Sequence, residues 1–112
     1  MLNVLVKGDA NGFVLIRAVE PQRGVELMKR RRGFDHVRRL CSGPGKLTQA
    51  FAITGRHHEM NLCADPRHCF ARNANAGVDV VADARIGITR SAHLPWRFTL
   101  RGSPFVSRTV KL

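Results

Sequence analysis

The sequence predicts an α+β fold in which mostly antiparallel strands occupy both ends of the chain and two or three helices lie between them. Apolar runs rich in β-branched residues stand near the N-terminus. Two stretches with helical spacing follow, and short strand-like runs return after residue 77. Because the chain has 112 residues, we expect one domain or a part of one, since domains typically contain roughly 50 to 250 residues.

The first two apolar runs, Leu2–Val6 and Phe13–Val19, are separated by a loop rich in Gly, Asn and Asp. This arrangement predicts a β-hairpin. The second run is almost continuously apolar, which predicts a strand covered on both faces. Arg17 stands inside it, and a buried guanidinium must be paired. Its partner is either an acidic residue from elsewhere in the fold or a bound water or ligand.

The next segment predicts a helix over residues 20–32, with Val25 and Met28 on its buried face and Gly33 as its stop. The last turn carries four consecutive cations at 29–32, which complement the helix dipole. Such a run is typical of a solvated face, and direct contact with DNA is the alternative.

A second helix is predicted to start near Pro44, because Ser42 or Gly43 can serve as its N-cap and proline suits the first helical position. We expect this helix to end near Gly55. Its apolar face is formed by three residues at helical spacing, Leu47, Ala50 and Phe51.

Lys46 falls in the first turn of this helix, where the macrodipole disfavours a cation unless an anion lies nearby. A bound phosphate would remove this conflict, and free N–H groups at a helix start can bind one. We therefore interpret Ser42, Gly43, Gly45 and Lys46 as a candidate phosphate-binding turn. The alternative is a surface turn with a solvated lysine.

Residues 56–77 are polar and weakly periodic, so we expect mostly loop there. His57, His58, Cys63, His68 and Cys69 could suggest zinc, but their spacing matches no finger or ribbon pattern, and we predict no metal. The strand-like runs of the C-terminal part are 78–81, 85–89, 97–100 and 105–107, which the intervening turn residues favour as antiparallel strands.

The chain is strongly basic, with 19 Lys and Arg against 8 Asp and Glu and a formal net charge of +11. This excess favours a polyanionic partner, and nucleic acid fits best. No apolar run approaches the roughly 18 residues of a membrane span, and the N-terminus has no secretory signal, so we expect a cytoplasmic protein. Three cysteines, an odd number, favour reduced thiols over a disulfide framework.

Several blocks of the sequence together resemble the 3-methyladenine DNA glycosylase family of the alkyladenine (mammalian-type) class. They arrive in the order of that family and cover nearly the whole chain. The blocks are Leu2-Asn3-Val4, residues 14–21 from Val14 to Pro21, Leu27-Met28, residues 40–50, Arg85-Ile86-Gly87-Ile88, residues 94–98 and residues 101–107.

The resemblance implies base-excision repair of duplex DNA containing damaged purines. The enzyme it implies flips out an alkylated or deaminated purine and hydrolyses the N-glycosidic bond of that purine with an activated water. Such an enzyme is expected to be a monomer, to need no cofactor and, in a bacterium, to associate with the nucleoid. It implies that Asn3 lines the lesion pocket and that Gly45-Lys46 contacts DNA phosphate. It also implies that Arg17 and the main-chain carbonyl of Ile86 position the water, together with a glutamate general base.

The resemblance covers only the C-terminal portion of the family's single domain. The N-terminal portion, which carries the glutamate base and the aromatic residues that stack on the flipped base, is expected to be missing, and the chain has no Tyr and one Trp. We therefore expect weak excision or none from this chain alone. The alternatives are a catalytically dead DNA-binding remnant and a small basic RNA-binding domain.

Overall fold

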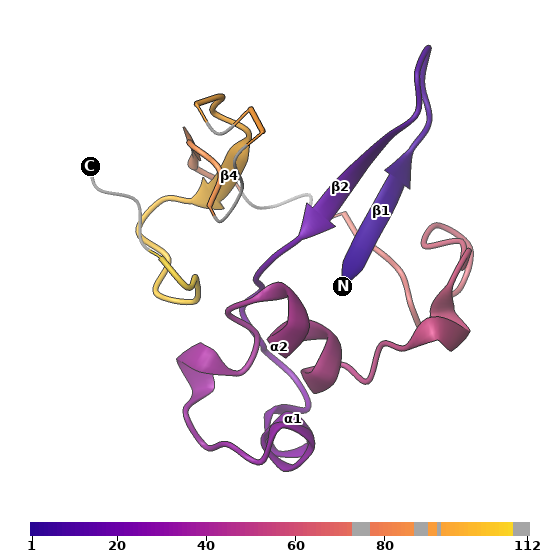
Figure 1. The fold of residues 1–112 in the computed structure, drawn as a ribbon. Helices are drawn as coiled ribbons and strands as arrows, with labels where there is room; N and C mark the ends of the chain where they lie inside the picture. Colours follow the sequence, from indigo (N-terminus) through magenta and orange to yellow (C-terminus); the bar gives the residue numbers. More distant parts are fainter. Residues whose placement is uncertain (73–76, 87–89, 92, 109–112) are drawn as a thin grey trace.

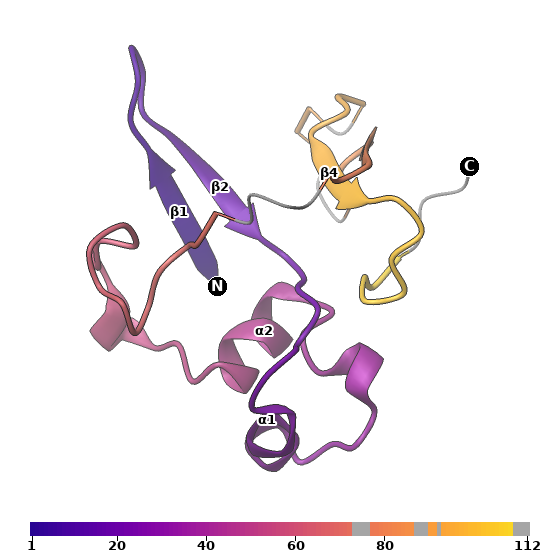
Figure 2. The same cartoon turned by 180° about the vertical axis from the view of Figure 1, so that it is seen from behind.

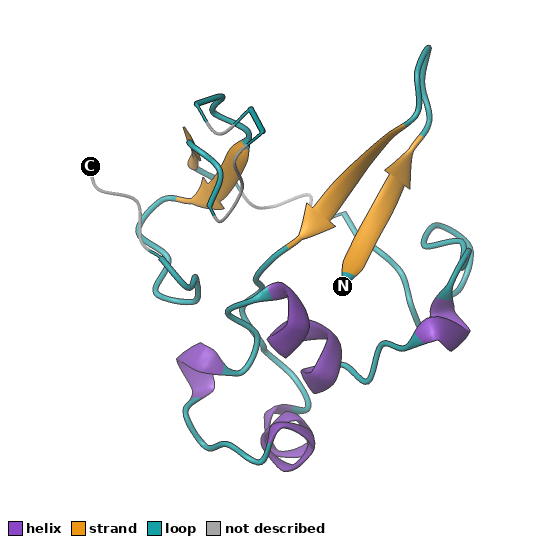
Figure 3. Cartoon of the chain, viewed as in Figure 1, coloured by secondary structure: helices purple, strands orange, loops and turns teal. Residues whose placement is uncertain are grey.

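The computed structural model describes residues 1–72, 77–86, 90–91 and 93–108, and within them it contains two helices and two antiparallel sheets of two strands each (Figures 1 and 3). The predicted α+β class is confirmed. In chain order, the elements are β1 (Leu2–Val6), β2 (Gly12–Ile16), α1 (Val25–Arg32), the 3₁₀ turn η1 (Val37–Arg39), α2 (Pro44–Ala50), the 3₁₀ turn η2 (Gly55–His57), β3 (Val80–Asp83) and β4 (Arg97–Leu100).

The predicted N-terminal hairpin is present, and its register pairs Leu2 with Ile16 at one end and Val6 with Gly12 at the other. Only its base packs on the core, through Leu2 and Ile16, while its tip projects away from the helices (Figure 1). The prediction that the second strand is covered on both faces is therefore wrong. Phe13 is 72% exposed, because no other described element lies over the tip.

Helix α1 begins at Val25, five residues later than predicted. Gly24 adopts a left-handed conformation with φ of 71°, which interrupts the helical backbone before Val25. The predicted end is confirmed: Gly33 is also left-handed, and its N–H bonds to carbonyls of the last turn. Met28 is buried as expected, and Val25 packs against the core.

The core is small and lies where α1 meets α2. Its buried members are Met28, Leu40, Cys41, Leu47 and Ala50. Pro44 is the first residue of α2, as predicted, and Gly43 is its N-cap. The helix ends at Ala50, short of the predicted Gly55, because Ala52 turns into a left-handed conformation with φ of 53°. Phe51 is consequently half-exposed and does not extend the apolar face.

Two arginines at the end of α1 join it to the segment around α2. The Arg32 guanidinium donates to the carbonyls of Leu40 and Arg39, at 3.1 and 3.4 Å, and to the side-chain oxygen of Gln49 at 3.0 Å. Arg31 donates to the carbonyl of Ala50 at 3.0 Å. Part of the basic run is thus structural rather than a solvated face.

In the C-terminal part, β4 has the predicted bounds and β3 lies two residues after the predicted 78–81 run. The predicted strand over 105–107 is wrong. After β4 the chain enters consecutive turns, in which Gly102 is left-handed and the Ser103 side chain accepts the N–H of Phe105. Of the run 85–89, Arg85 and Ile86 are not in a strand, and residues 87–89 lie outside the described part.

Arginine–aspartate pairs flank the β3–β4 ladder at both ends. Arg101 Nε lies 2.7 Å from an Asp79 carboxylate oxygen, and the buried Arg97 lies 3.9 Å from Asp83 and also donates to the carbonyl of Arg108. Seen from the back, this sheet and the 55–70 segment lie on opposite sides of the hairpin (Figure 2). No helix in the described ranges is long and apolar enough to cross a bilayer.

We predict that Arg32→Ala lowers the free energy of unfolding by about 1–3 kcal/mol, because hydrogen bonds from a charged group to two main-chain carbonyls are lost. Urea titration followed by circular dichroism measures this change. Arg30→Ala is the matched control, since Arg30 is exposed on the same turn, and its effect should stay within about 0.5 kcal/mol. Equal losses in the two variants would contradict the structural role of Arg32.

The three cysteines should differ in thiol reactivity. Cys41 is buried and its Sγ lies 3.9 Å from the Met28 sulfur, and burial raises the pKa of the Cys41 thiol. Cys63 and Cys69 are exposed. We therefore expect iodoacetamide at neutral pH to modify Cys63 and Cys69 quickly and Cys41 only after denaturation, as read by peptide mass spectrometry. Labelling of all three at one rate would show that the core is open.

Candidate nucleic-acid interface

The predicted phosphate-binding turn is a rigid, partly buried connection into α2. Ser42 is only 3% exposed, and its hydroxyl donates to the carbonyl of Arg39 at 3.5 Å, so it supports the turn and does not cap the helix. The N–H groups of Gly45 and Lys46 have no recorded acceptor among the described residues. They are therefore available to an anion at the start of the helix.

The Lys46 side chain is exposed and folds back over the turn. A Cβ atom placed on Gly43 would lie 3.5 Å from Cδ of Lys46 and 3.9 Å from its Cε. The lysine stem therefore lies along the backbone of Gly43, and its ammonium group is presented at the surface near the helix start. Ser42, Gly43, Gly45 and Lys46 thus lie together in space, in one turn.

Arg17 follows β2 directly and is half-buried. Two residues later, the N–H of Val19 donates to the carbonyl of Cys41 at 3.1 Å, next to Ser42. This bond holds the segment that carries Arg17 against the phosphate-binding turn. Within the described ranges, Arg17 has no recorded ion pair or side-chain hydrogen bond, so none of the described carboxylates is its partner.

Asn3 lies on β1, is exposed, and pairs in register with Leu15. In an antiparallel ladder, paired residues share a face, and so do residues two apart along a strand. Arg17 follows the last residue of β2, so Asn3 and Arg17 both lie at the base of the hairpin. Their meeting in one site stays a prediction.

Ile86 is half-buried and follows β3 by three residues. The described residues record no hydrogen bond between its backbone and the segment around Arg17. The next three residues, 87–89, lie outside the described part. The expected pairing of Arg17 with the Ile86 carbonyl stays a prediction.

The arginine–aspartate pairs of the C-terminal sheet were missed at the sequence level, although the sequence holds a signal for them. Asp79 and Asp83 are four residues apart, and so are Arg97 and Arg101. In the observed register, equal spacing on two antiparallel strands brings both pairs face to face. These two arginines are therefore neutralised locally.

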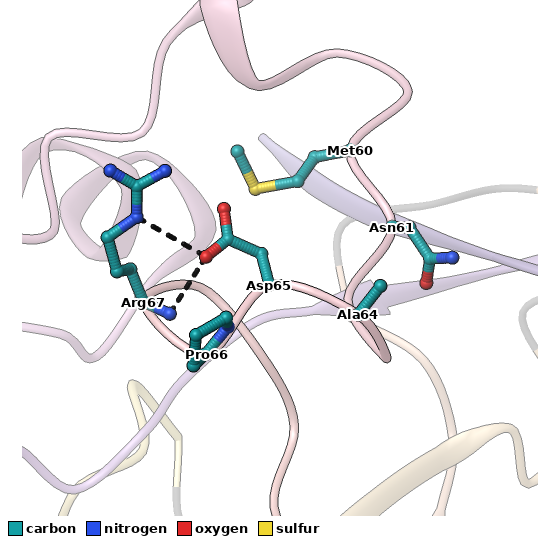
Figure 4. Close-up of a pocket in the computed structure, with 6 residues that line it drawn as sticks. All are labelled: Met60, Asn61, Ala64, Asp65, Pro66 and Arg67. Atoms are coloured by element: carbon teal, nitrogen blue, oxygen red, sulfur yellow. Dashed lines mark hydrogen bonds and ion pairs between the residues drawn. The ribbon is translucent and has the colours of Figure 1, made fainter.

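The 58–70 segment forms an open surface hollow, lined by Met60, Asn61, Ala64, Asp65, Pro66 and Arg67 (Figure 4). The backbone N–H of Arg67 donates to the Asp65 carboxylate at 2.9 Å, and its guanidinium lies 3.4 Å from the same oxygen. The backbone bond, followed by the guanidinium, lowers the pKa of the Asp65 carboxyl. This acid is held ionised beside an arginine and does not resemble a general base.

The histidines and cysteines of this segment make no metal centre among the described residues. The His57 and His68 rings lie 5.2 Å apart, centroid to centroid. Nδ1 of His57 accepts the N–H of Thr54 at 3.0 Å, so this ring nitrogen stabilises the η2 turn. The other three, His58, Cys63 and Cys69, are exposed.

Comparison with known proteins gives a consistent answer. The sequence pattern of the family described as methylpurine-DNA glycosylase matches residues 1–104. A protein of Nitrobacter winogradskyi named "Putative 3-methyladenine DNA glycosylase" is 52% identical over 98 residues, which are 88% of this chain and 46% of that protein. A protein of the same name from Rhodopseudomonas palustris (strain HaA2) is 49% identical over 112 residues, 98% of this chain and 54% of its own length.

The chain spans about half the length of the curated relatives it matches. The match nevertheless includes the hairpin, both helices and both strands of the C-terminal sheet. This chain therefore belongs to the methylpurine-DNA glycosylase family.

Proposed function

We propose that this chain binds duplex DNA containing alkylated or deaminated purines and forms part of a site that hydrolyses the N-glycosidic bond of the flipped base. The observation that carries this proposal is the bond from Val19 N–H to the Cys41 carbonyl, which fixes the Arg17 segment beside the turn at Ser42–Lys46. A base-flipping enzyme needs this proximity, because its backbone contacts must position the nucleotide whose sugar reacts.

The turn acts as the DNA-backbone anchor. The N–H groups of Gly45 and Lys46 and the lysine ammonium offer three donors to one phosphate. Gly43 and Gly45 let the phosphate approach the backbone closely, and the buried Ser42 keeps the turn in place. The formal charge of +11 favours association with any polyanion, so the turn supplies position rather than most of the affinity.

Asn3 and Arg17 act at the reacting nucleotide. Asn3 contacts the edge of the flipped purine and selects against guanine through a clash with its exocyclic amino group. The half-buried Arg17 donates to the attacking water, and the Ile86 carbonyl accepts from it. This assignment also explains why a half-buried guanidinium lacks a carboxylate partner among the described residues.

Four of the described carboxylates are paired with cations, which disfavours each of them as a general base. Asp65, Asp79 and Asp83 lie beside arginines, and Asp35 lies 2.9 Å from Lys29. Loss of a general base typically reduces a rate by about 10²–10⁴-fold. We therefore propose that this chain by itself holds DNA and the water site but excises bases weakly, with the base supplied by residues outside it.

We predict little or no release of hypoxanthine from a duplex in a single-turnover assay with this chain in excess, because the resemblance to the glycosylase family assigns the glutamate general base to none of the residues of this chain. Base release is measured by alkaline cleavage of the resulting abasic site. Rapid release by this chain would show that one of its own carboxylates acts as the base.

We predict that Lys46→Gln weakens binding to a short duplex several-fold at moderate salt, because a direct phosphate contact is lost. Fluorescence anisotropy titration measures the change. Lys7→Gln is the matched control. Lys7 is an exposed lysine in the hairpin loop, and its substitution removes the same charge. If both variants weakened DNA binding equally, Lys46 would contribute only net charge, and the turn would not be the DNA-backbone anchor.

A further inference from the structure

The segment 29–39 carries six cations that the structure divides into two groups. Three of the six cations interact with acidic side chains or with main-chain carbonyls of the protein. Lys29 lies 3.1 Å from Glu26 and 2.9 Å from Asp35, while Arg31 and Arg32 donate to main-chain carbonyls. The other three, Arg30, Arg38 and Arg39, are exposed, and no ion pair or side-chain hydrogen bond is recorded for them in the described part of the chain.

The backbone under the exposed arginines is held on two sides. The carbonyl of Arg39 accepts from Nη2 of Arg32 at 3.4 Å and from the hydroxyl of Ser42 at 3.5 Å. The first bond ties η1 to α1, and the second ties it to the phosphate-binding turn. Arg38 and Arg39 therefore lie on backbone that is held next to the turn at Ser42–Lys46.

The connector between α1 and η1 is also ordered by side chains. The Arg32 guanidinium lies 5.6 Å from the centroid of the Phe34 ring, and the His36 ring stacks on Phe34 at 6.4 Å. The N–H of Phe34 donates to the carbonyl of Lys29. Asp35, the acid of this connector, is held by Lys29, so it does not neutralise the exposed arginines.

We propose that Arg38 and Arg39 form a second phosphate-contacting surface, which extends the anchor at Lys46 along the backbone of the same DNA duplex. This inference rests on the proposed function. Guanidinium groups suit it because their planar fork matches a phosphate in two hydrogen bonds. Because no ion pair of Arg38 or Arg39 is recorded among the described residues, their guanidinium groups can also release bound counterions from DNA without first breaking a recorded protein ion pair.

The salt dependence of binding tests this surface. Each neutralised phosphate contributes about 0.9 to the slope of log K against log salt concentration. For Arg38→Gln/Arg39→Gln, we expect the slope on an undamaged duplex to fall by about 2 and the affinity at moderate salt to fall at least tenfold. Arg38→Lys/Arg39→Lys should retain the slope, since it keeps both charges.

The charge-matched control is Arg56→Gln/Arg72→Gln, two exposed arginines outside segment 29–39. It should leave the slope nearly unchanged, and circular dichroism verifies that each variant keeps its fold. Equal slopes for the wild type and Arg38→Gln/Arg39→Gln, with salt-dependent binding intact, would overturn the second surface alone. Absence of duplex binding by the wild type would overturn the proposed function instead, and a clear preference for an RNA duplex would overturn DNA as the partner of this surface.

Discussion

The folded unit depends on the guanidinium group of Arg32. The turn that follows η1 runs between the two helices, and its carbonyls at Arg39 and Leu40 point at the end of α1. No backbone hydrogen bond to either carbonyl is recorded among the described residues, and the Arg39 carbonyl accepts from the Ser42 hydroxyl as well. A hydrogen bond to a charged group typically contributes about 1.5–3 kcal/mol. Arg32 donates to both carbonyls and reaches Gln49 on α2 with its remaining nitrogen. The core contains only five buried apolar residues among those described, so this polar contact adds to the few apolar contacts that hold the candidate anchor turn.

Local signals in the sequence predicted the elements with short-range causes. Pro44 predicted the start of α2, and Gly33 predicted the end of α1. The apolar runs on either side of residues 7–12 predicted the N-terminal hairpin. The start predicted for α1 and the strand predicted over 105–107 were wrong, because the backbone conformation at nearby glycines is not visible in the sequence. Gly24 could have stood inside a helix, yet its left-handed backbone delays α1, and the turns after Gly102 replace a strand that the apolar residues at 105–106 favoured.

The individual residues of the candidate site could be predicted from the sequence, whereas their proximity in space could not. The turn from Ser42 to Lys46 and the unusual position of Arg17 were visible in the sequence, because each breaks a simple pattern. Their proximity depends on the long-range bond between Val19 and Cys41, which no periodicity reveals. Likewise, the basic run at 29–32 gave no indication that Arg31 and Arg32 are structural while Arg30 is not, since that division follows from how α2 crosses α1.

The matched spacing of charges in β3 and β4 also specifies how these strands align. Two short apolar strands could slide past each other with little change in buried area. In the observed alignment, both aspartates face arginines, at the two ends of the ladder. A slip by one residue would separate both pairs and turn each side chain to the opposite face. The four charges therefore favour this one register of β3 against β4 over the alternatives that a pair of short strands could adopt.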